Sequence, residues 1–198
     1  MKNKNISTVR GMHDIYGASF YKQKKIIDNF IQVASLFNFT PMHTPIMEHS
    51  EVFLRTLGDS SDVVMKEMYS FLDKSNESLT LRPEGTAGIA RALITNGFTQ
   101  NLPQKYFYYG PMFRYERPQK GRLRQFHQVG LEFFGKGSYF EDSEVIRAAY
   151  YFLKKLNILD NVKLKINTIG KIDTRNNFVN EIKNYFSKNK KKLSPDSL

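Results

Sequence analysis

The chain has 198 residues, a formal net charge of +11 at pH 7, no cysteine, and a hydrophobic share of 40%. The lack of cysteine excludes disulfides, thiolate metal sites and a thiol nucleophile, while the excess of lysine and arginine fits either a polyanionic partner, such as nucleic acid or a phosphorylated ligand, or a solvated lysine surface. No apolar run approaches the roughly 20 residues of a membrane span, and the start MKNKNISTVRG has no apolar signal segment, so we expect a cytoplasmic protein without membrane contact.

The amino-terminal part of the sequence predicts two helices joined by an extended segment. Apolar residues recur at helical spacing from Ala18 to Phe37, which indicates an amphipathic helix. Two prolines then interrupt an extended stretch, and Ser50 precedes EVFLRTL. We therefore expect a strand that leads into a short helix ending at Gly58.

The middle of the chain predicts a hairpin followed by a helix. Residues 69–72 and 79–81 have the composition of strands and flank the polar turn DKSNES. Thr86 is expected to cap the next helix, which stops at the dipeptide Asn96-Gly97.

The remaining segments complete a mixed fold. A hairpin over 112–134 precedes an amphipathic helix over 140–158, which has acids at its start and lysines at its end, as the helix dipole prefers. A short strand, VKLKINTIG at 162–170, and a helix from Asp173 to Phe186 follow. The sum is an α+β domain with a mainly antiparallel sheet flanked by helices, which we expect on one face of the sheet.

The hairpin at 112–134 presents two unlike faces, because side chains alternate along a strand. The face expected to pack beneath the helices carries Phe113, Val129, Leu131 and Phe133. The opposite face carries Arg114, Glu116, Gln128 and Glu132. Gly130 has no side chain and leaves a gap between Gln128 and Glu132, so this face has the layout of a floor beneath a ligand.

An ordinary solvated sheet face is the alternative interpretation, since antiparallel sheets often expose one face to water. The bend RPQKGRLRQ favours a ligand instead, because four cations repel one another unless an anion such as a triphosphate neutralises them; they are Arg117, Lys120, Arg122 and Arg124. Phe126, at the mouth of the bend, suits either stacking on a base or plain packing.

These segments resemble a known family. GPMFRYERPQKGRLRQFHQVGLEFFG closely resembles the second signature motif of class II aminoacyl-tRNA synthetases, and its RPQKGR and RQFHQ portions resemble the histidyl-tRNA synthetases in particular. TPIMEHSEVFLRTLG is similar to the first motif, which implies a homodimer contact, and TLRPEGT is similar to the amino-acid loop. The resemblance runs from about Val9 to the INTIG segment and implies the class II catalytic core.

The resemblance implies a reaction and an ATP site. The carboxylate of histidine would attack the α-phosphate of ATP to form histidyl-adenylate, which then charges tRNA(His). Arg114 would bridge the carboxylate and the α-phosphate, Glu116 would touch the adenine, Phe126 would stack on it, and Arg122 would hold the outer phosphates with Mg²⁺. An ion pair of Glu116 with Arg114 or Arg117 is the structural alternative.

The resemblance also implies a histidine site. Glu84, Gly85 and Thr86 belong to the amino-acid loop, and Glu84, Thr86 and Gln128 would receive the α-ammonium group. Glu132 would accept a hydrogen bond from the imidazole, which discriminates against amino acids without that donor. Thr86 can serve as a helix cap at the same time. The four histidines have no spacing typical of a metal site, so no metal ligand set is expected within the chain.

The resemblance is incomplete. Residues 1–198 correspond to part of the catalytic domain with motifs 1 and 2, whereas motif 3 and the anticodon-binding domain are absent, so we expect complete activity to need the missing part. Two alternatives stay open: a histidine-sensing regulatory paralogue of the kind that serves ATP phosphoribosyltransferase, and an inactive truncated remnant.

Overall fold

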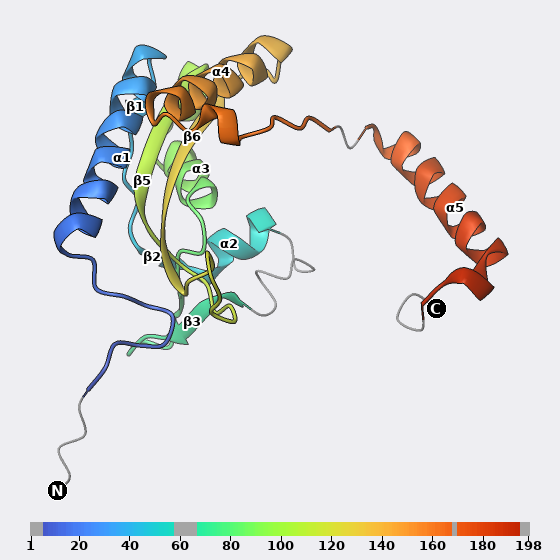
Figure 1. Ribbon diagram of the computed structural model, residues 1–198, viewed down its shortest axis with the longest axis horizontal. Coiled ribbons are helices and arrows are strands. Elements are labelled where there is room, and N and C mark those ends of the chain that lie inside the picture. Colours follow the sequence, from blue (N-terminus) through green and yellow to red (C-terminus); the bar gives the residue numbers. More distant parts are fainter. Residues whose placement is uncertain (1–5, 58–66, 168–169, 195–198) are drawn as a thin grey trace, which may run out of the picture. The chain divides into compact units, whose positions relative to one another are not determined.

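The computed structural model describes residues 6–57, 67–167 and 170–194 (Figure 1). The chain divides into two compact units, Met1–Leu159 and Asp160–Leu198. Within the described ranges, no helix is both long enough and apolar enough to cross a membrane. The assignment of all 198 residues to one catalytic domain stays a prediction.

The first unit contains the helices that the sequence predicts for it, but the hairpin predicted over 112–134 begins earlier, at Gln104. Its first strand ends at Phe113, so Arg114 and Glu116, predicted on a face of that strand, lie in the bend that follows it. The helices of this unit are α1 (Gly17–Leu36), α2 (Ser50–Leu57), α3 (Thr86–Thr95) and α4 (Tyr139–Lys155). Its strands are β1 (Thr40–Pro41), β2 (Met47–His49), β3 (Tyr69–Leu72), β4 (Ser78–Leu81), β5 (Gln104–Phe113) and β6 (Gln125–Phe134). A short 3-10 helix occupies Phe98–Asn101, and another, Leu159–Asn161, spans the boundary between the two units. Gly97 follows α3 with a positive φ of 71°, which confirms the predicted glycine stop, whereas Gly58 lies outside the described residues.

The second unit consists mainly of α5 (Ile172–Lys188), followed by a 3-10 helix over Lys190–Lys192. The predicted carboxy-terminal helix is thus confirmed. The predicted strand at 162–170 is wrong for residues 162–167, which belong to no strand of the two described sheets, and 168–169 lie outside the described residues. Alternation of apolar and polar residues alone does not make a strand.

The described strands form two three-stranded sheets, with the orders β1-β5-β6 and β2-β4-β3. The long β5 and β6 are antiparallel over their whole length, from Gln104 opposite Phe134 to Phe113 opposite Gln125. Strand β1 runs parallel to β5. Strands β2 and β3 are both antiparallel to β4. The prediction of a mainly antiparallel sheet is confirmed.

Helices cover both faces of the β5–β6 ribbon, so the prediction that they lie on one face is wrong (Figure 1). On one face, α1 and α4 pack over Phe107 and over Val129, Leu131 and Phe133 of β6. On the other face, Ile89 and Leu93 of α3 pack against Tyr106, Tyr108 and Met112 of β5. Strand β5 causes this arrangement, because it carries large apolar side chains on both of its faces and both must be shielded from water.

One side chain, Phe113, departs from the packing predicted for its face of the hairpin. Phe113 is half-buried and belongs to neither cluster, because it lies at the very end of β5.

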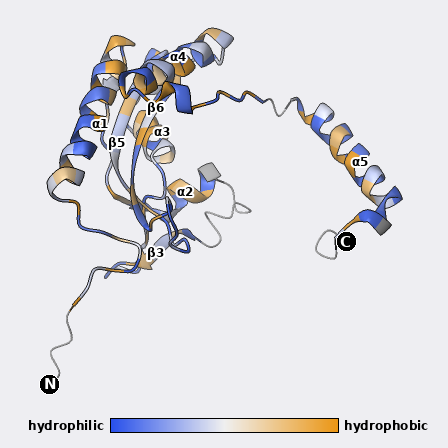
Figure 2. Cartoon of the chain, in the orientation of Figure 1, coloured by the Kyte–Doolittle hydropathy of each residue, from blue (hydrophilic) through white to orange (hydrophobic). Residues whose placement is uncertain are grey.

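Val33 and Ala34 of α1 are buried among polar neighbours that face solvent, and Figure 2 shows this mixture of hydrophobic and hydrophilic residues along the helix. The amphipathic character predicted for α1 is confirmed.

Candidate active site

The register of β5 and β6 places the three predicted residues of β6 on the face covered by α3. Gln128 lies opposite Gly110, Gly130 opposite Tyr108, and Glu132 opposite Tyr106. The loop before α3 reaches this same face, since Thr86 Oγ1 donates a hydrogen bond to Glu132 Oε1 at 2.7 Å. The structure therefore brings the amino-acid loop and β6 together, as the sequence predicts.

Gln128 provides a second link between the loop and the sheet. Its Oε1 accepts a hydrogen bond from the Gly85 backbone N–H at 3.2 Å. The same oxygen lies 3.3 Å from the hydroxyl of Tyr108. The carbonyl oxygen of this side chain is therefore engaged by the protein itself.

Glu84, not Thr86, caps helix α3. Its carboxylate accepts hydrogen bonds from the backbone N–H groups of Thr86 and Ala87, the latter at 2.9 Å. Thr86 is the first helical residue, after Gly85 at the N-cap position. The prediction of a Thr86 cap is wrong, because its hydroxyl bonds Glu132 while the longer Glu84 side chain reaches the free amides of the helix start.

The end of the site that carries Glu84 and Glu132 has two acidic side chains close together. Burial raises the pKa of Glu132, as does the nearby Glu84, while the hydrogen bond from Thr86 opposes that rise. Burial and the charge of Glu132 raise the pKa of Tyr108 to about 12. Two neighbouring carboxylates that are partly desolvated suit a ligand that brings hydrogen-bond donors or positive charge.

The gap predicted above Gly130 is occupied. A Cβ atom added at Gly130 would collide with the ring of Tyr108, and so would one at Gly85. The prediction of an open gap is wrong, because the ring of Tyr108 lies there. Sequence analysis missed this residue, although its place two positions before Gly110 puts it on the site face.

The opposite end of the site is built around Arg114. Its Nε donates to the carbonyl oxygen of Pro83 at 2.9 Å, and its guanidinium lies 5.1 Å from the centre of the Phe126 ring. Glu116 sits between two cations, 4.0 Å from Arg114 and 3.2 Å from Arg122. Glu116 thus forms the ion pair with Arg114 that the structural alternative describes, and its second partner is Arg122 in place of Arg117.

The amino-terminal segment holds the base of the arginine-rich bend. The carbonyl oxygen of Gly11 accepts hydrogen bonds from the backbone N–H groups of Arg124 and Gln125 at 2.8 and 3.3 Å. Arg124 also donates from Nε to the carbonyl oxygen of Glu116 at 3.1 Å and stacks on Tyr115. The bend is therefore anchored by backbone contacts while Arg122 remains exposed at its surface.

Arg82 supports the amino-acid loop from beneath and was also missed by sequence analysis. It is 6% exposed, and its guanidinium donates to the carbonyl oxygens of Pro111 and Thr44, both at 3.0 Å. Burial lowers its pKa. The residue thus has a structural role and is not available to a ligand.

Metal ligation by the protein alone finds no support in the part of the chain that the structure describes. No three or more histidine, aspartate or glutamate side chains gather there in a group that could hold a metal ion.

A sequence model of the histidyl-tRNA synthetases matches residues 11–174, which is most of the chain. The chain belongs to the histidyl-tRNA synthetase family. Among its relatives are the histidine–tRNA ligase of Gluconacetobacter diazotrophicus, 50% identical over 98% of this chain and 46% of that protein, and that of Malacoplasma penetrans, 46% identical over 97% and 45%. The chain thus spans about half the length of the curated relatives it matches.

Solved structures of the family agree with this assignment. The apo histidyl-tRNA synthetase of S. aureus is similar to the chain with a TM-score of 0.74 and 30% identity, over 96% of this chain and 45% of that one. A Bacillus halodurans protein described as an ATP phosphoribosyltransferase regulatory subunit/histidyl-tRNA synthetase is similar with a TM-score of 0.67 and 26% identity, over 78% and 39%. The predicted fold of a synthetase catalytic core, present in part, is confirmed.

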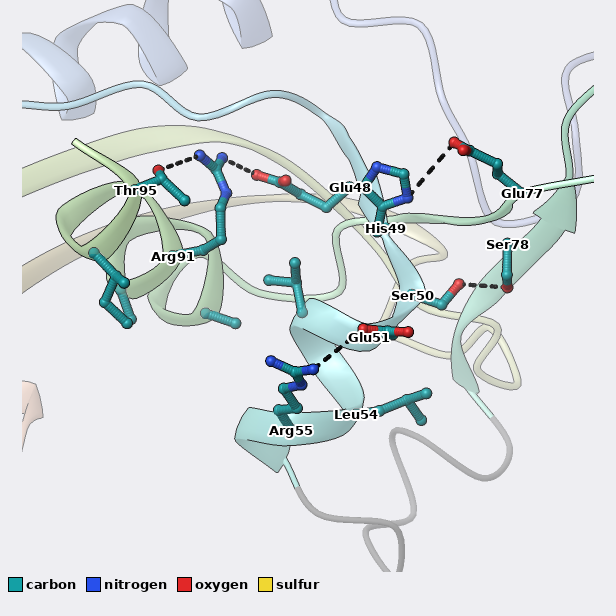
Figure 3. A pocket seen from close by; sticks show the side chains of 14 residues that line it. Glu48, His49, Ser50, Glu51, Leu54, Arg55, Glu77, Ser78, Arg91 and Thr95 are labelled. Atoms are coloured by element: carbon teal, nitrogen blue, oxygen red, sulfur yellow. Dashed lines mark hydrogen bonds and ion pairs between the residues drawn. The ribbon is translucent and has the colours of Figure 1, made fainter. Parts of the chain in front are cut away.

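A large cavity of this family member lies apart from the candidate site, among β2, α2 and α3 (Figure 3). Its volume is about 740 Å³, and its rim carries the ion pairs Arg91–Glu48 and His49–Glu77. Beneath it, Ser50 Oγ hydrogen-bonds the hydroxyl of Thr80 at 2.7 Å, which ties the start of α2 to β4. The cavity therefore belongs to the segment that resembles motif 1.

Proposed function

We propose that the chain is the amino-terminal part of a histidine–tRNA ligase, in which histidine is activated by ATP and transferred to tRNA(His) in the cytoplasm. One observation carries the proposal: a single face of β6 joins a carboxylate-lined end, with Thr86 bonded to Glu132, to a guanidinium end at Arg114. Amino acid and nucleotide bound at these two ends would meet with carboxylate and α-phosphate adjacent. Positioning of this kind is the main contribution that a protein makes to such a transfer.

The histidine end supports recognition of this amino acid. Glu84 and Thr86 are the groups for the α-ammonium, and Glu132 is the acceptor for an imidazole N–H. Because Glu132 is partly buried, a rival amino acid without that donor leaves a desolvated carboxylate unpaired. Discrimination by roughly 10⁴ is typical of such a site.

The guanidinium end supports binding of ATP. Arg114 has the planar fork that can hold the substrate carboxylate and the α-phosphate together, and Phe126 beside it offers a ring for the adenine. Glu116 is proposed to contact the adenine end once ATP replaces it as the partner of the exposed Arg122. Mg²⁺ would arrive with ATP, held by phosphate oxygens and water, since such ions commonly depend on the nucleotide for most of their ligands.

Calorimetry on the chain and pyrophosphate exchange on a completed enzyme test this proposal. We expect the chain to bind histidine and ATP, and to reject phenylalanine, which lacks the imidazole donor. We also expect histidine-dependent exchange of pyrophosphate into ATP once the chain is joined to the carboxy-terminal half of the Gluconacetobacter relative. A joined protein that is folded and shows no exchange contradicts the assignment.

A regulatory role is the second candidate, because the Bacillus halodurans protein described as a regulatory subunit/synthetase is similar in structure. The pairing of Arg114 and Arg122 around Glu116 favours the ligase, since sensing histidine does not require groups for a triphosphate. Co-purification with an ATP phosphoribosyltransferase subunit, without tRNA charging, would favour regulation. A chain that binds neither histidine nor ATP would favour the inactive remnant.

A further inference from the structure

Tyr108 is a buried phenol at the centre of the histidine end, and none of the roles proposed above uses it. The residue is 6% exposed. Its ring fills the space beside Gly130, its direct partner in the register of β5 and β6, and beside Gly85 of the amino-acid loop. Because a side chain at either glycine would collide with the ring, the two glycines form a slot for it.

The hydroxyl of Tyr108 connects this slot to Gln128. It lies 3.3 Å from Gln128 Oε1, and the Gly85 N–H donates to the same atom at 3.2 Å. A backbone N–H donates and never accepts, so the Gln128 atom facing it must be the carbonyl oxygen and not the amide nitrogen. Two contacts from two different elements therefore fix the orientation of one side-chain amide.

The protonation of Tyr108 agrees with a donor role. Burial and the charge of Glu132 raise its pKa to about 12, so the hydroxyl keeps its proton at neutral pH. With both lone pairs of Gln128 Oε1 occupied, the amide has its two N–H hydrogens left to offer. No described residue accepts a hydrogen bond from that nitrogen.

We propose that Tyr108 is a positioning residue that turns Gln128 so that its NH₂ group meets the carboxylate of histidine. This proposal rests on the proposed function and revises the role that the family resemblance implies for Gln128, since the α-ammonium is left to Glu84 and Thr86. An N–H donor beside a carboxylate oxygen complements Arg114, which approaches the same group from the nucleotide end. The ring of Tyr108 also sets the spacing between the amino-acid loop and β6.

Two variants and two ligands test the proposal by calorimetry. Tyr108→Phe removes the hydroxyl and keeps the ring. The control is Tyr106→Phe, on the same face of β5, where Tyr106 is 8% exposed and its hydroxyl donates to Gln104. The ligands are histidine and histamine, which lacks the carboxylate. We expect Tyr108→Phe to weaken histidine about 3- to 10-fold, as loss of one hydrogen bond does, and to leave histamine and the control unchanged.

A readout without ligand separates this proposal from the proposed function. By NMR, the Gly85 amide of Tyr108→Phe should exchange its hydrogen several-fold faster than in the parent chain. Equal weakening of both ligands, or unchanged affinities, overturns the proposal, as does unchanged exchange. If the parent chain binds neither ligand, the proposed function fails, and the exchange rate of Gly85 alone decides the positioning role of Tyr108.

Discussion

Two glutamates of the chain have pKa values shifted in opposite directions because their surroundings differ. Burial raises the pKa of Glu132, a residue proposed to receive the imidazole. Backbone N–H groups, with that of Ser138 first, lower the pKa of Glu141 at the start of α4. The partly buried Glu132 carboxylate thus accepts a hydrogen bond from one side chain, Thr86, whereas the Glu141 carboxylate accepts several from backbone N–H groups.

Glu132→Gln is expected to raise stability and weaken histidine binding. The folded pKa of Glu132 lies above its unfolded value, so its ionisation costs stability increasingly as pH rises through that folded pKa. The variant should melt a few degrees higher than the parent at pH 7 and nearly together with it at pH 3. Its affinity for histidine should fall at least about 10-fold by calorimetry.

The exposed Glu181→Gln serves as the control and should change neither property. A Glu132→Gln variant that is less stable than the parent at pH 7 would contradict the assigned cause of the pKa shift.

Arg114→Lys is expected to abolish chemistry while preserving the fold. Lysine keeps the charge but lacks the planar fork that spans two oxygens, so histidine-dependent pyrophosphate exchange by the completed enzyme should fall at least about 100-fold. The melting temperature should change little, because one hydrogen bond, to Pro83, is lost. Arg147→Lys, on the exposed side of α4, is the matched control, and equal rates for both variants would contradict the role.

Individual site residues differ in how far the sequence predicts them. Alternation along β6 correctly predicts that Gln128 and Glu132 share one face of the strand, because this depends on local spacing alone. The packing of Tyr108 and the hydrogen bonds of Arg82 cannot be predicted from local spacing, since each side chain contacts residues far away in the sequence. Pairing register, which a single sequence does not reveal, decides what their side chains meet.

At the scale of elements, the start of α4 is held by one side chain. Glu141 accepts hydrogen bonds from the backbone N–H groups of Lys136, Gly137 and Ser138 at 3.2, 2.7 and 3.0 Å. A carboxylate here satisfies free donors and complements the positive end of the helix dipole. The link between β6 and α4 is therefore fixed by electrostatics.

Glu141→Ala is expected to destabilise the chain in a pH-dependent way. The folded pKa of Glu141 lies below its unfolded value, so its stabilisation is present above the unfolded pKa and is lost as pH falls through the folded pKa. The variant should melt on the order of 3 °C lower at pH 7 and close to the parent in strong acid. Asp142→Ala removes the neighbouring exposed carboxylate and should have a smaller effect, and equal losses would contradict the assignment.

Elements with a helical period were predicted well, and sheets less well. α1, α3, α4 and α5 have stripes and end signals that operate locally. The prediction that helices lie on one face of the sheet is wrong, because apolar side chains on both faces of β5 need to be shielded from water. The segment at 162–167 alternates like a strand, yet Leu164 and Ile166 are exposed and no described strand pairs with it.

At the scale of the whole molecule, the face formed by β2, α2 and α3 is hollow and partly apolar. The cavity drawn in Figure 3 has a volume of about 740 Å³, and Ile94, which lines it, is 66% exposed. The ion pair between Arg91 and Glu48 at its rim links α3 to β2. A second copy of the chain is the proposed partner for this face, in keeping with the resemblance of β2 and α2 to motif 1.

Ile94→Glu is expected to dissociate that homodimer. A charge placed in the contact must be desolvated without a partner, which commonly costs more than a small interface can supply. Sedimentation velocity should show dimers for the parent at micromolar concentration and monomers for the variant. Leu36→Glu, on the exposed side of α1, should leave the dimer intact, and a monomeric parent would contradict the prediction.

The contact of Gly11 with the start of β6 decides how much of the amino-terminal segment the chain needs. Its carbonyl oxygen receives the amides of Arg124 and Gln125, so the arginine-rich bend depends on a residue more than a hundred positions upstream. A polypeptide that began at Met12 would lack Gly11, so the arginine-rich bend and the start of β6 would lose this anchor. An expression tag should accordingly be added before Met1, so that residues 1–11 are kept.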